Sequence, residues 1–260
     1  GKAAGGGKNP KKKKGKVRNL ASSVILICLI GIFAVSAFNV YKIVRDYLKD
    51  RNAYSAVQDA AGVDKKSDKW DGNIDFDELR KINGDVVGWV YQEGTCINYP
   101  IVQGENNDTY LHTLFDGSAG GAGTIFVDYR TEKPFKQFNT IVYGHHMKDA
   151  SMFAVLKYYI TSDYAKEHPV IEIITPEQKY HMMVWACVNP PANSEIYTNN
   201  VGEDDAQDYL DWLADNAEYT TDVEVTTEDK IVELSTCAYE YDNARYVVVG
   251  KLVPWDDEEN

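Results

Sequence analysis

An uncharged, apolar stretch near the start of the chain most constrains what this protein can fold into. Leu20–Val40 contains no Asp, Glu, Lys or Arg over twenty-one residues and is rich in Ile, Val, Leu and Phe. A helix rises about 1.5 Å per residue, so a helix of this length crosses the hydrocarbon core of a bilayer. The sequence therefore predicts a membrane anchor, and the rest of the fold must be built from the residues that follow it.

The charges on either side of this stretch predict its orientation. Residues 1–18 hold eight Lys or Arg and no acid, whereas the whole chain has a formal net charge of −13. Lysines ahead of a span favour a cytoplasmic N-terminus with the remainder outside. A basic tail can bind nucleic acid, but the acidic remainder argues against a polyanionic partner. We expect a basic cytoplasmic tail (1–18), a single-pass cell-membrane anchor (19–41) and an extracellular domain, with no nucleic-acid partner.

A cleaved signal peptide is the competing interpretation of the same stretch. Such a peptide has an apolar region of about 7–15 residues that closes in a small-x-small cleavage site. Ala34–Ala37 (AVSA) permits a site of this kind, but the apolar character continues past it. An uncleaved anchor is therefore the favoured prediction.

The residues after the anchor predict an amphipathic helix and then a linker. Apolar residues recur at i, i+3 and i+4 from Val40 to Leu48, with charged residues between them, which is typical of a helix with one apolar face. We expect this helix to run to about Ala61, either as a stalk or packed on the domain. Gly62–Asp71 is polar and charged. Residues 42–72 are thus predicted as helix and linker, and residues 73–260 as the extracellular domain.

Short β-rich runs dominate the sequence after the linker. Separated by turn residues, such runs predict an antiparallel sheet or barrel, not a parallel βαβ fold. Three helices are expected among them: Asp75–Ile82 with Asp75 as its cap, Met152–Ile160 after Asp149 as a cap, and Glu203–Asn216. The predicted strands are Gly88–Gln92, Cys96–Gln103, Thr124–Tyr129, Thr140–Tyr143, Val170–Thr175, Lys179–Val188, Asp222–Thr226, Ile231–Cys237 and Arg245–Val253.

The cysteines and histidines show no metal-binding spacing. The chain has four cysteines and contains neither a CxxC pair nor HExxH, so neither a zinc site nor another metal or cofactor is expected. Cys96 and Cys187 lie in apolar strand patterns and are expected to be free and buried, although a bridge between them stays open. Gly117–Gly123 lacks the ending of a phosphate loop and is interpreted as a connection.

The segment Ile231–Val253 predicts a hairpin with reactive side chains at its strand ends. Its first apolar run ends at Cys237, a polar turn with Asp242 and Asn243 follows, and Arg245 opens a second run. The hairpin places the thiol and the guanidinium at facing strand ends. A thiolate nucleophile and a fixed cation are two parts of an acyl-transfer site, and His145 offers the general acid or base. The alternative is that Cys237 is only a small buried residue.

The order of these motifs resembles sortases. Leu234-Ser235-Thr236-Cys237 is followed eight residues on by Arg245 and is preceded about ninety residues upstream by Gly144-His145. The run from Val86 to Arg130 is similar to class B sortases in particular, and the likeness extends from about Asp75 to Val253. It implies a mainly β fold, an eight-stranded barrel with peripheral helices. It also implies a cysteine transpeptidase that cleaves secreted proteins after the Thr of a Pro-x-Thr-like C-terminal sorting signal. An amine of a peptidoglycan precursor or a pilin then accepts the acyl group.

The resemblance also assigns roles to residues. It implies Cys237 as nucleophile, His145 as acid and base, and Arg245 at the oxyanion or the bound signal, with His146 at a variable place beside His145. Some class B members carry an acid two residues after the cysteine, where this chain has Tyr239, with Glu240 one further on. His112, His168 and His181 are expected to be satisfied structural residues. The implied substrate-binding residues are Asn107 and Leu111, on a helix edging the groove, and Tyr143, Ser235 and Thr236, which flank the catalytic pair.

Two other classes of function remain open from the sequence. A hydrolysing cysteine protease is the first, but the papain order and setting and the caspase wording are both missing. A non-catalytic β-rich surface module is the second. The arrangement in space decides between them, because an enzyme requires Cys237, His145 and Arg245 to converge.

Overall fold

The computed structural model describes residues 11–63, 70–191, 194–237 and 245–255, and it divides the chain into two units, residues 1–46 and 47–260. Helix α1 (Lys11–Ala60) is long and apolar enough, in its part from Ser22 onward, to cross a membrane. Its described side chains up to Asp46 are exposed. The first unit therefore presents an apolar helix that is a candidate membrane span.

The second unit is built around a closed sheet. Its strand order is β5-β1-β2-β3-β4-β8-β9-β6, and a further β5–β6 pairing closes the ring. Strand β7 pairs with the last residues of β6. The predicted eight-stranded barrel is thus confirmed. The strands are β1 (Val86–Tyr91), β2 (Asn98–Val102), β3 (Ile125–Val127), β4 (Asn139–His145), β5 (Val170–Ile174), β6 (Lys179–Val188), β7 (Ala217–Thr220), β8 (Ile231–Cys237) and β9 (Val247–Pro254).

Most neighbouring strands are antiparallel, as the short runs predict. Two pairs, β2–β3 and β4–β8, are parallel. Parallel neighbours cannot be joined by a tight hairpin, and β4 and β8 are indeed separated by three further strands in the sequence. This long-range parallel pairing is the feature of the barrel that organises the site described below.

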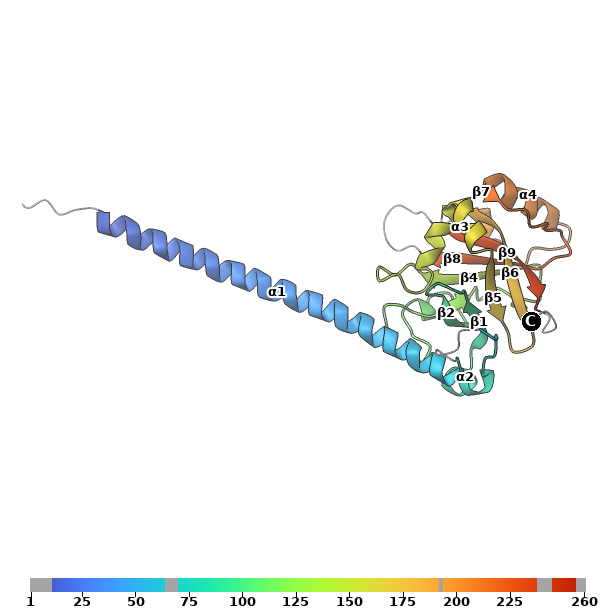
Figure 1. The fold of residues 1–260 in the computed structure, drawn as a ribbon, viewed down its shortest axis with the longest axis horizontal. Helices are drawn as coiled ribbons and strands as arrows, with labels where there is room; N and C mark the ends of the chain where they lie inside the picture. The colour runs from blue at the N-terminus through green and yellow to red at the C-terminus, as the bar shows by residue number, and fades with distance from the viewer. Residues whose placement is uncertain (1–10, 64–69, 192–193, 238–244, 256–260) are drawn as a thin grey trace, which may run out of the picture. The chain divides into compact units, whose positions relative to one another are not determined.

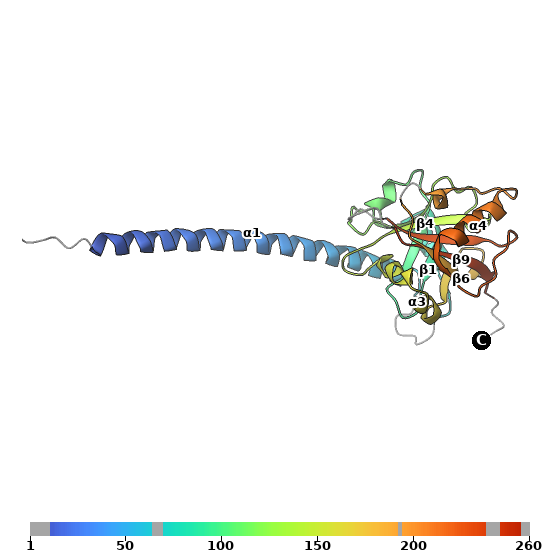
Figure 2. The ribbon, with the colours of Figure 1, turned by 90° about the horizontal axis from the view of Figure 1, so that it is seen from above.

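The helices lie at the periphery of the barrel. Helix α2 (Phe76–Ile82) begins as predicted, with the Asp75 carboxylate accepting from the Glu78 amide at 2.9 Å. Helix α4 (Ala206–Asn216) packs against β6 and β7 (Figures 1 and 2). The other helices are α3 (Ser162–Glu167) and the 3-10 helices η1 (Thr109–Leu111), η2 (Ala154–Ile160) and η3 (Glu195–Tyr197).

Three local predictions were wrong. The helix expected from Met152 is the 3-10 helix η2, and Asp149 does not cap it, because its carboxylate accepts from the amide and hydroxyl of Ser151. Asp222–Thr226 is not a strand; β7 forms directly after α4 and pairs with β6 instead. Cys96 is exposed in the turn before β2, whereas Cys187 is buried; both thiols are free.

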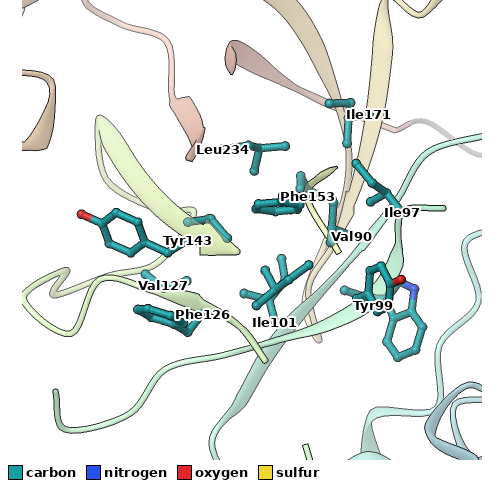
Figure 3. Packing of buried hydrophobic residues seen from close by; sticks show 14 of the residues in the cluster. Val90, Ile97, Tyr99, Ile101, Phe126, Val127, Tyr143, Phe153, Ile171 and Leu234 are labelled. Carbon is teal, nitrogen blue, oxygen red and sulfur yellow. The ribbon is translucent and has the colours of Figure 1, made fainter. Parts of the chain in front are cut away.

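The interior of the barrel is filled by apolar side chains from most of its strands. Figure 3 shows Leu234 of β8 and Phe153 close to Val90 of β1 and Ile101 of β2. All four are fully buried. Tyr143 of β4 lies at the edge of this cluster, with its hydroxyl pointing away from the other side chains (Figure 3). The core therefore fixes β4 and β8, the two strands whose ends carry the predicted His and Cys.

The last turns of α1 belong to the same unit as the barrel and pack on it. Asp50, Tyr54, Val57 and Ala61 are buried and recur at helical spacing along one face. The Asp50 carboxylate accepts from the Ala122 amide at 3.0 Å, and the Tyr54 hydroxyl donates to the Gly123 carbonyl. Of the two options left open for this amphipathic segment, packing on the domain is the one observed from Asp50 onward.

Candidate active site

The parallel pair β4–β8 brings His145 and Cys237 together at one end of the barrel. The two strands stay in register from Asn139 opposite Ile231 to His145 opposite Cys237. Adjacent strands lie about 4.8 Å apart, so the two residues end neighbouring strands side by side. The backbone of Cys237 is described and its side chain is not. The residues predicted in the turn after it (Tyr239, Glu240, Asp242 and Asn243) lie outside the described residues.

The ring of His145 is oriented by a backbone carbonyl. Its Nε2 lies 2.7 Å from the carbonyl oxygen of Leu111, at the end of η1. A carbonyl only accepts hydrogen bonds, so this contact requires the hydrogen on Nε2. In the neutral ring Nδ1 then holds the lone pair. The structure thus fixes the tautomer as well as the direction of the imidazole.

The surroundings of His145 favour its neutral form. Burial is the largest influence and lowers the pKa of the imidazole below its ordinary value. The nearby His112 lowers it further, and the Leu111 carbonyl opposes both. The rings of His112 and His145 stack with centroids 6.1 Å apart. His112 was expected to be a satisfied structural residue, and this ring contact places it beside His145.

Arg245 stands beside the same strand end. It precedes β9, and two hydrogen bonds of 3.0 Å between Thr236 and Tyr246 fasten this part of the chain to β8. The strand begins at Val247, two residues later than predicted. The guanidinium carbon of Arg245 lies 5.4 Å from the ring centroid of Tyr197 in η3, a cation–π contact. The backbone of residue 246 is thus bonded to Thr236, the residue before Cys237, while the convergence of the guanidinium with the thiol stays a prediction.

Tyr197 is a site residue that the sequence analysis missed. Its hydroxyl lies 3.2 Å from the Ser235 hydroxyl, and its ring stacks on Tyr143 with centroids 6.2 Å apart. It belongs to the connection between β6 and β7, about fifty residues from either Arg245 or Tyr143. No motif marks it, since a lone Tyr among the 18 in the chain carries no signal of its own.

A buried carboxylate, also missed, orders the predicted substrate-binding residues. Asp128 is fully buried, pairs with Arg130 at 2.8 Å, and accepts from Asn107 at 3.0 Å and from the Tyr143 hydroxyl at 3.1 Å. Burial opposes its ionisation, but the bonds to Arg130 and Asn107 prevail and lower its pKa. Asn107 also accepts from the Tyr129 amide at 3.0 Å and lies before η1, not on a helix as predicted.

The remaining predicted residues are built into the frame of the site. Ser235 and Thr236 are buried on β8, in register with Tyr143 and Gly144 of β4. Leu111 is buried and supplies the carbonyl for His145. The other histidines lie in different settings. The His146 ring meets Tyr246 edge-on, His181 pairs with Glu172 at 2.7 Å, and His168 packs on Tyr164.

Gly144 leaves no room for a side chain at this site. A Cβ there would lie 2.5 Å from the ring of Phe153, which is fully buried in the core. We expect Gly144→Ala to cost about 1–3 kcal/mol of unfolding free energy by overpacking, and to lower activity because it displaces His145. Urea denaturation measures the first effect and turnover the second. Gly84→Ala, with nothing within 4 Å of the added Cβ, is the matched control; equal stability of the two variants would contradict the prediction.

Comparison with known proteins agrees with this geometry. The Sortase domain family model matches residues 92–253. Sortase B of Staphylococcus aureus is 34% identical over 242 residues, covering 88% of this chain and 94% of the relative. Sortase B of Listeria monocytogenes is 32% identical over 246 residues, covering 92% and 99%. The structure of a Staphylococcus aureus sortase B–substrate complex has a TM-score of 0.72 at 33% identity, covering 82% of this chain and all of that one.

In this closed β-barrel, neighbouring strands end in a histidine and a cysteine, and an arginine lies beside them. These features define the class of cysteine transpeptidases to which sortases belong. This chain belongs to the sortase family, and its relatives place it in class B.

Proposed function

We propose that this protein is a membrane-anchored class B sortase that joins secreted proteins to an amine of the cell wall. It would recognise a Pro-x-Thr-like C-terminal sorting signal and cleave after its Thr. The observation that carries the proposal is the register of His145 with Cys237 across β4 and β8, within a chain of the sortase family.

Cys237 would be the nucleophile. Its thiolate attacks the carbonyl carbon of the scissile bond, and the C–N bond then breaks to leave a thioester. Nδ1 of neutral His145 would first take the proton of the Cys237 thiol and give it to the departing amine. It would later take a proton from the incoming amine and return it to the Cys237 sulfur as the thioester breaks. The hydrogen bond from Nε2 to the Leu111 carbonyl leaves Nδ1 as the ring nitrogen suited to these transfers. The enzyme ends each cycle in its starting state.

Arg245 would stabilise the oxyanion of the tetrahedral intermediates or bind the backbone of the sorting signal. A planar guanidinium offers several donors in fixed directions. Its contact with Tyr197 restricts where it can point, and preorganised donors are what such a site requires.

The substrate-binding roles of Asn107, Leu111, Tyr143, Ser235 and Thr236 remain proposals of the same kind. Their side chains or backbones already contact Asp128, Tyr197, Tyr246 and His145. They would therefore shape the rigid wall against which a peptide lies. The apolar part of α1 would anchor the protein, with the basic tail (1–18) in the cytoplasm and the domain from about residue 73 outside the cell.

The decisive experiment incubates the detergent-solubilised full chain with a fluorogenic peptide carrying an Asn-Pro-x-Thr-type signal and with triglycine as acceptor. Mass spectrometry follows the products. A peptide cleaved after Thr and joined to triglycine is the expected result. Cleaved peptide without a joined product, over a series of amine acceptors, would support a cysteine protease instead. No turnover of any Pro-x-Thr peptide would leave the binding module as the better explanation.

A further inference from the structure

A carboxylic acid is buried in the strand that leads to Cys237. Glu233 lies in the middle of β8 with no solvent exposure, between Ile141 of β4 and Val249 of β9. Its Oε1 lies 2.8 Å from the hydroxyl oxygen of Tyr209, a residue of α4. Its Oε2 has no hydrogen-bond partner within the described part of the chain. An ionised carboxylate is costly in such a place.

The Tyr209 hydroxyl has two close neighbours and only one hydrogen. Its oxygen also lies 2.8 Å from the carbonyl oxygen of Ile196 in η3. If Glu233 were ionised, both neighbours would be acceptors and one contact would lack a hydrogen. If Glu233 is protonated, its O–H donates to Tyr209 and Tyr209 donates to Ile196, so that both hydrogen bonds form. The neutral acid thus satisfies both contacts of the Tyr209 hydroxyl, and the partnerless Oε2 carries no charge, which lowers the cost of burying it.

The hydrogen bonds from Glu233 through Tyr209 end at η3, the element whose Tyr197 contacts Arg245. Ile196 and Tyr197 are consecutive residues of η3. The ring of Tyr197 makes a cation–π contact with the guanidinium of Arg245. The same segment is held a second time by Asn139, which donates to the Thr198 carbonyl at 2.8 Å. Glu233 and Asn139 thus fasten the Tyr197 segment to neighbouring strands of the barrel.

We propose that Glu233 is a positioning residue whose protonated carboxyl, through Tyr209 and the Ile196 carbonyl, holds Tyr197 and thereby Arg245 in place. Ionisation would reverse the first bond. The Tyr209 hydrogen would turn to the carboxylate, which is the stronger acceptor, and the Ile196 carbonyl would lose its donor. This inference rests on the proposed function, since Arg245 acts there.

The groups that face Glu233 agree with this assignment. From α4 it meets Tyr209, whose own pKa burial raises, so this hydroxyl keeps its hydrogen. Asn139 and Ile141 of β4 and Val249 of β9 carry no charge. Burial raises the pKa of Glu233 to about 8, against the smaller opposing effects of Tyr209 and Asn139. This pKa lies above that of a Glu in the unfolded chain. The contribution of neutral Glu233 to folding stability is therefore complete at acidic pH, and it is lost as the pH rises through about 8.

The test compares Glu233→Gln, Glu233→Ala and wild type in the full chain over pH 6 to 9.5. The Gln amide can donate to Tyr209 at every pH, so it should rescue the Ala variant, whose kcat we expect to fall about tenfold. The ratio of kcat for Glu233→Gln to that for wild type should rise about fivefold above pH 8, the rate equivalent of one hydrogen bond. The control is Glu172→Gln, because Glu172 lies on β5 and is separated from β8 by β6 and β9. This variant should show the same dependence of kcat on pH as wild type.

Two readouts do not depend on turnover. The carboxyl ¹³C resonance of Glu233, assigned by its loss in Glu233→Gln, should titrate near pH 8, and the Arg245 Nε–H resonance should shift with it in wild type only. A Glu233 resonance that titrates near pH 4 to 5, or pH profiles that stay parallel in wild type and Glu233→Gln, would overturn the proposal. A protein without transpeptidase activity would refute the proposed function, and the two resonances would still decide whether Glu233 is neutral and coupled to Arg245.

Discussion

Cys237→Ala is expected to abolish both cleavage of the sorting-signal peptide and its joining to triglycine, with kcat reduced by about 10⁴-fold or more. The size follows from the role: without the thiolate no thioester forms, and the other groups of a covalent site act only in concert with the nucleophile. The backbone of β8 is held by pairing on both sides up to Ser235, so the exchange of one terminal side chain should leave the fold intact. Product mass under single-turnover conditions measures the loss.

Cys187→Ala is the matched control for this experiment. Cys187 is buried and free on β6, so its replacement removes a thiol and costs packing without touching the strand ends. It should lower stability while kcat stays within about threefold of wild type, and a thiol-reactive probe should still stop turnover. Joined product from Cys237→Ala at a rate near that of wild type would remove Cys237 from the mechanism.

His145→Ala is expected to lower kcat by about 10³-fold, while His146→Ala stays within about threefold of wild type. The two histidines are adjacent, but only His145 ends β4 in register with Cys237 and has Nε2 fixed by the Leu111 carbonyl. Loss of a positioned acid and base accounts for an effect of this size. Kinetics with saturating acceptor, at several pH values, separate the two variants.

A complementary outcome tests the assignment further. His146 meets Tyr246 edge-on. His146→Ala should therefore lower the melting temperature slightly, while kcat stays within about threefold of wild type. If His146→Ala lost the larger part of the activity and His145→Ala did not, the neighbouring histidine would be the acid and base, and the register of β4 with β8 would have been misinterpreted.

Much of the barrel, and part of the candidate active site, follows from local sequence patterns. Alternating β-branched residues predict β8 and its hairpin with β9, and the strand Lys179–Val188 was predicted with its observed limits. The thiol and the guanidinium are recognisable within one predicted hairpin, because both belong to residues close together in the chain. The assignment of His145, about ninety residues away, rests on the resemblance to sortases.

The parts that were missed depend on contacts between distant residues. The acceptor for His145 is a backbone carbonyl, which any residue at position 111 would supply, so no residue type announces it. Tyr197 matters because η3 lies beside β8 and β9 in space. Glu233 reads as one polar residue in an apolar strand, and only the positions of Tyr209 and Ile196 show why it is tolerated there. Cys96 was misplaced because the turn before β2 interrupts an apolar run.

The parallel pairing of β4 with β8 also determines when the active site can come into being. The two strand ends are about ninety residues apart in sequence, and contacts between such distant segments form late, because the entropy of closing a long loop is paid before they are gained. A chain that has formed its hairpins but has not closed the barrel therefore has a cysteine and a histidine that are not neighbours. Transpeptidation by the proposed pair of Cys237 and His145 would therefore require a closed barrel, and we expect a chain without it not to catalyse the reaction.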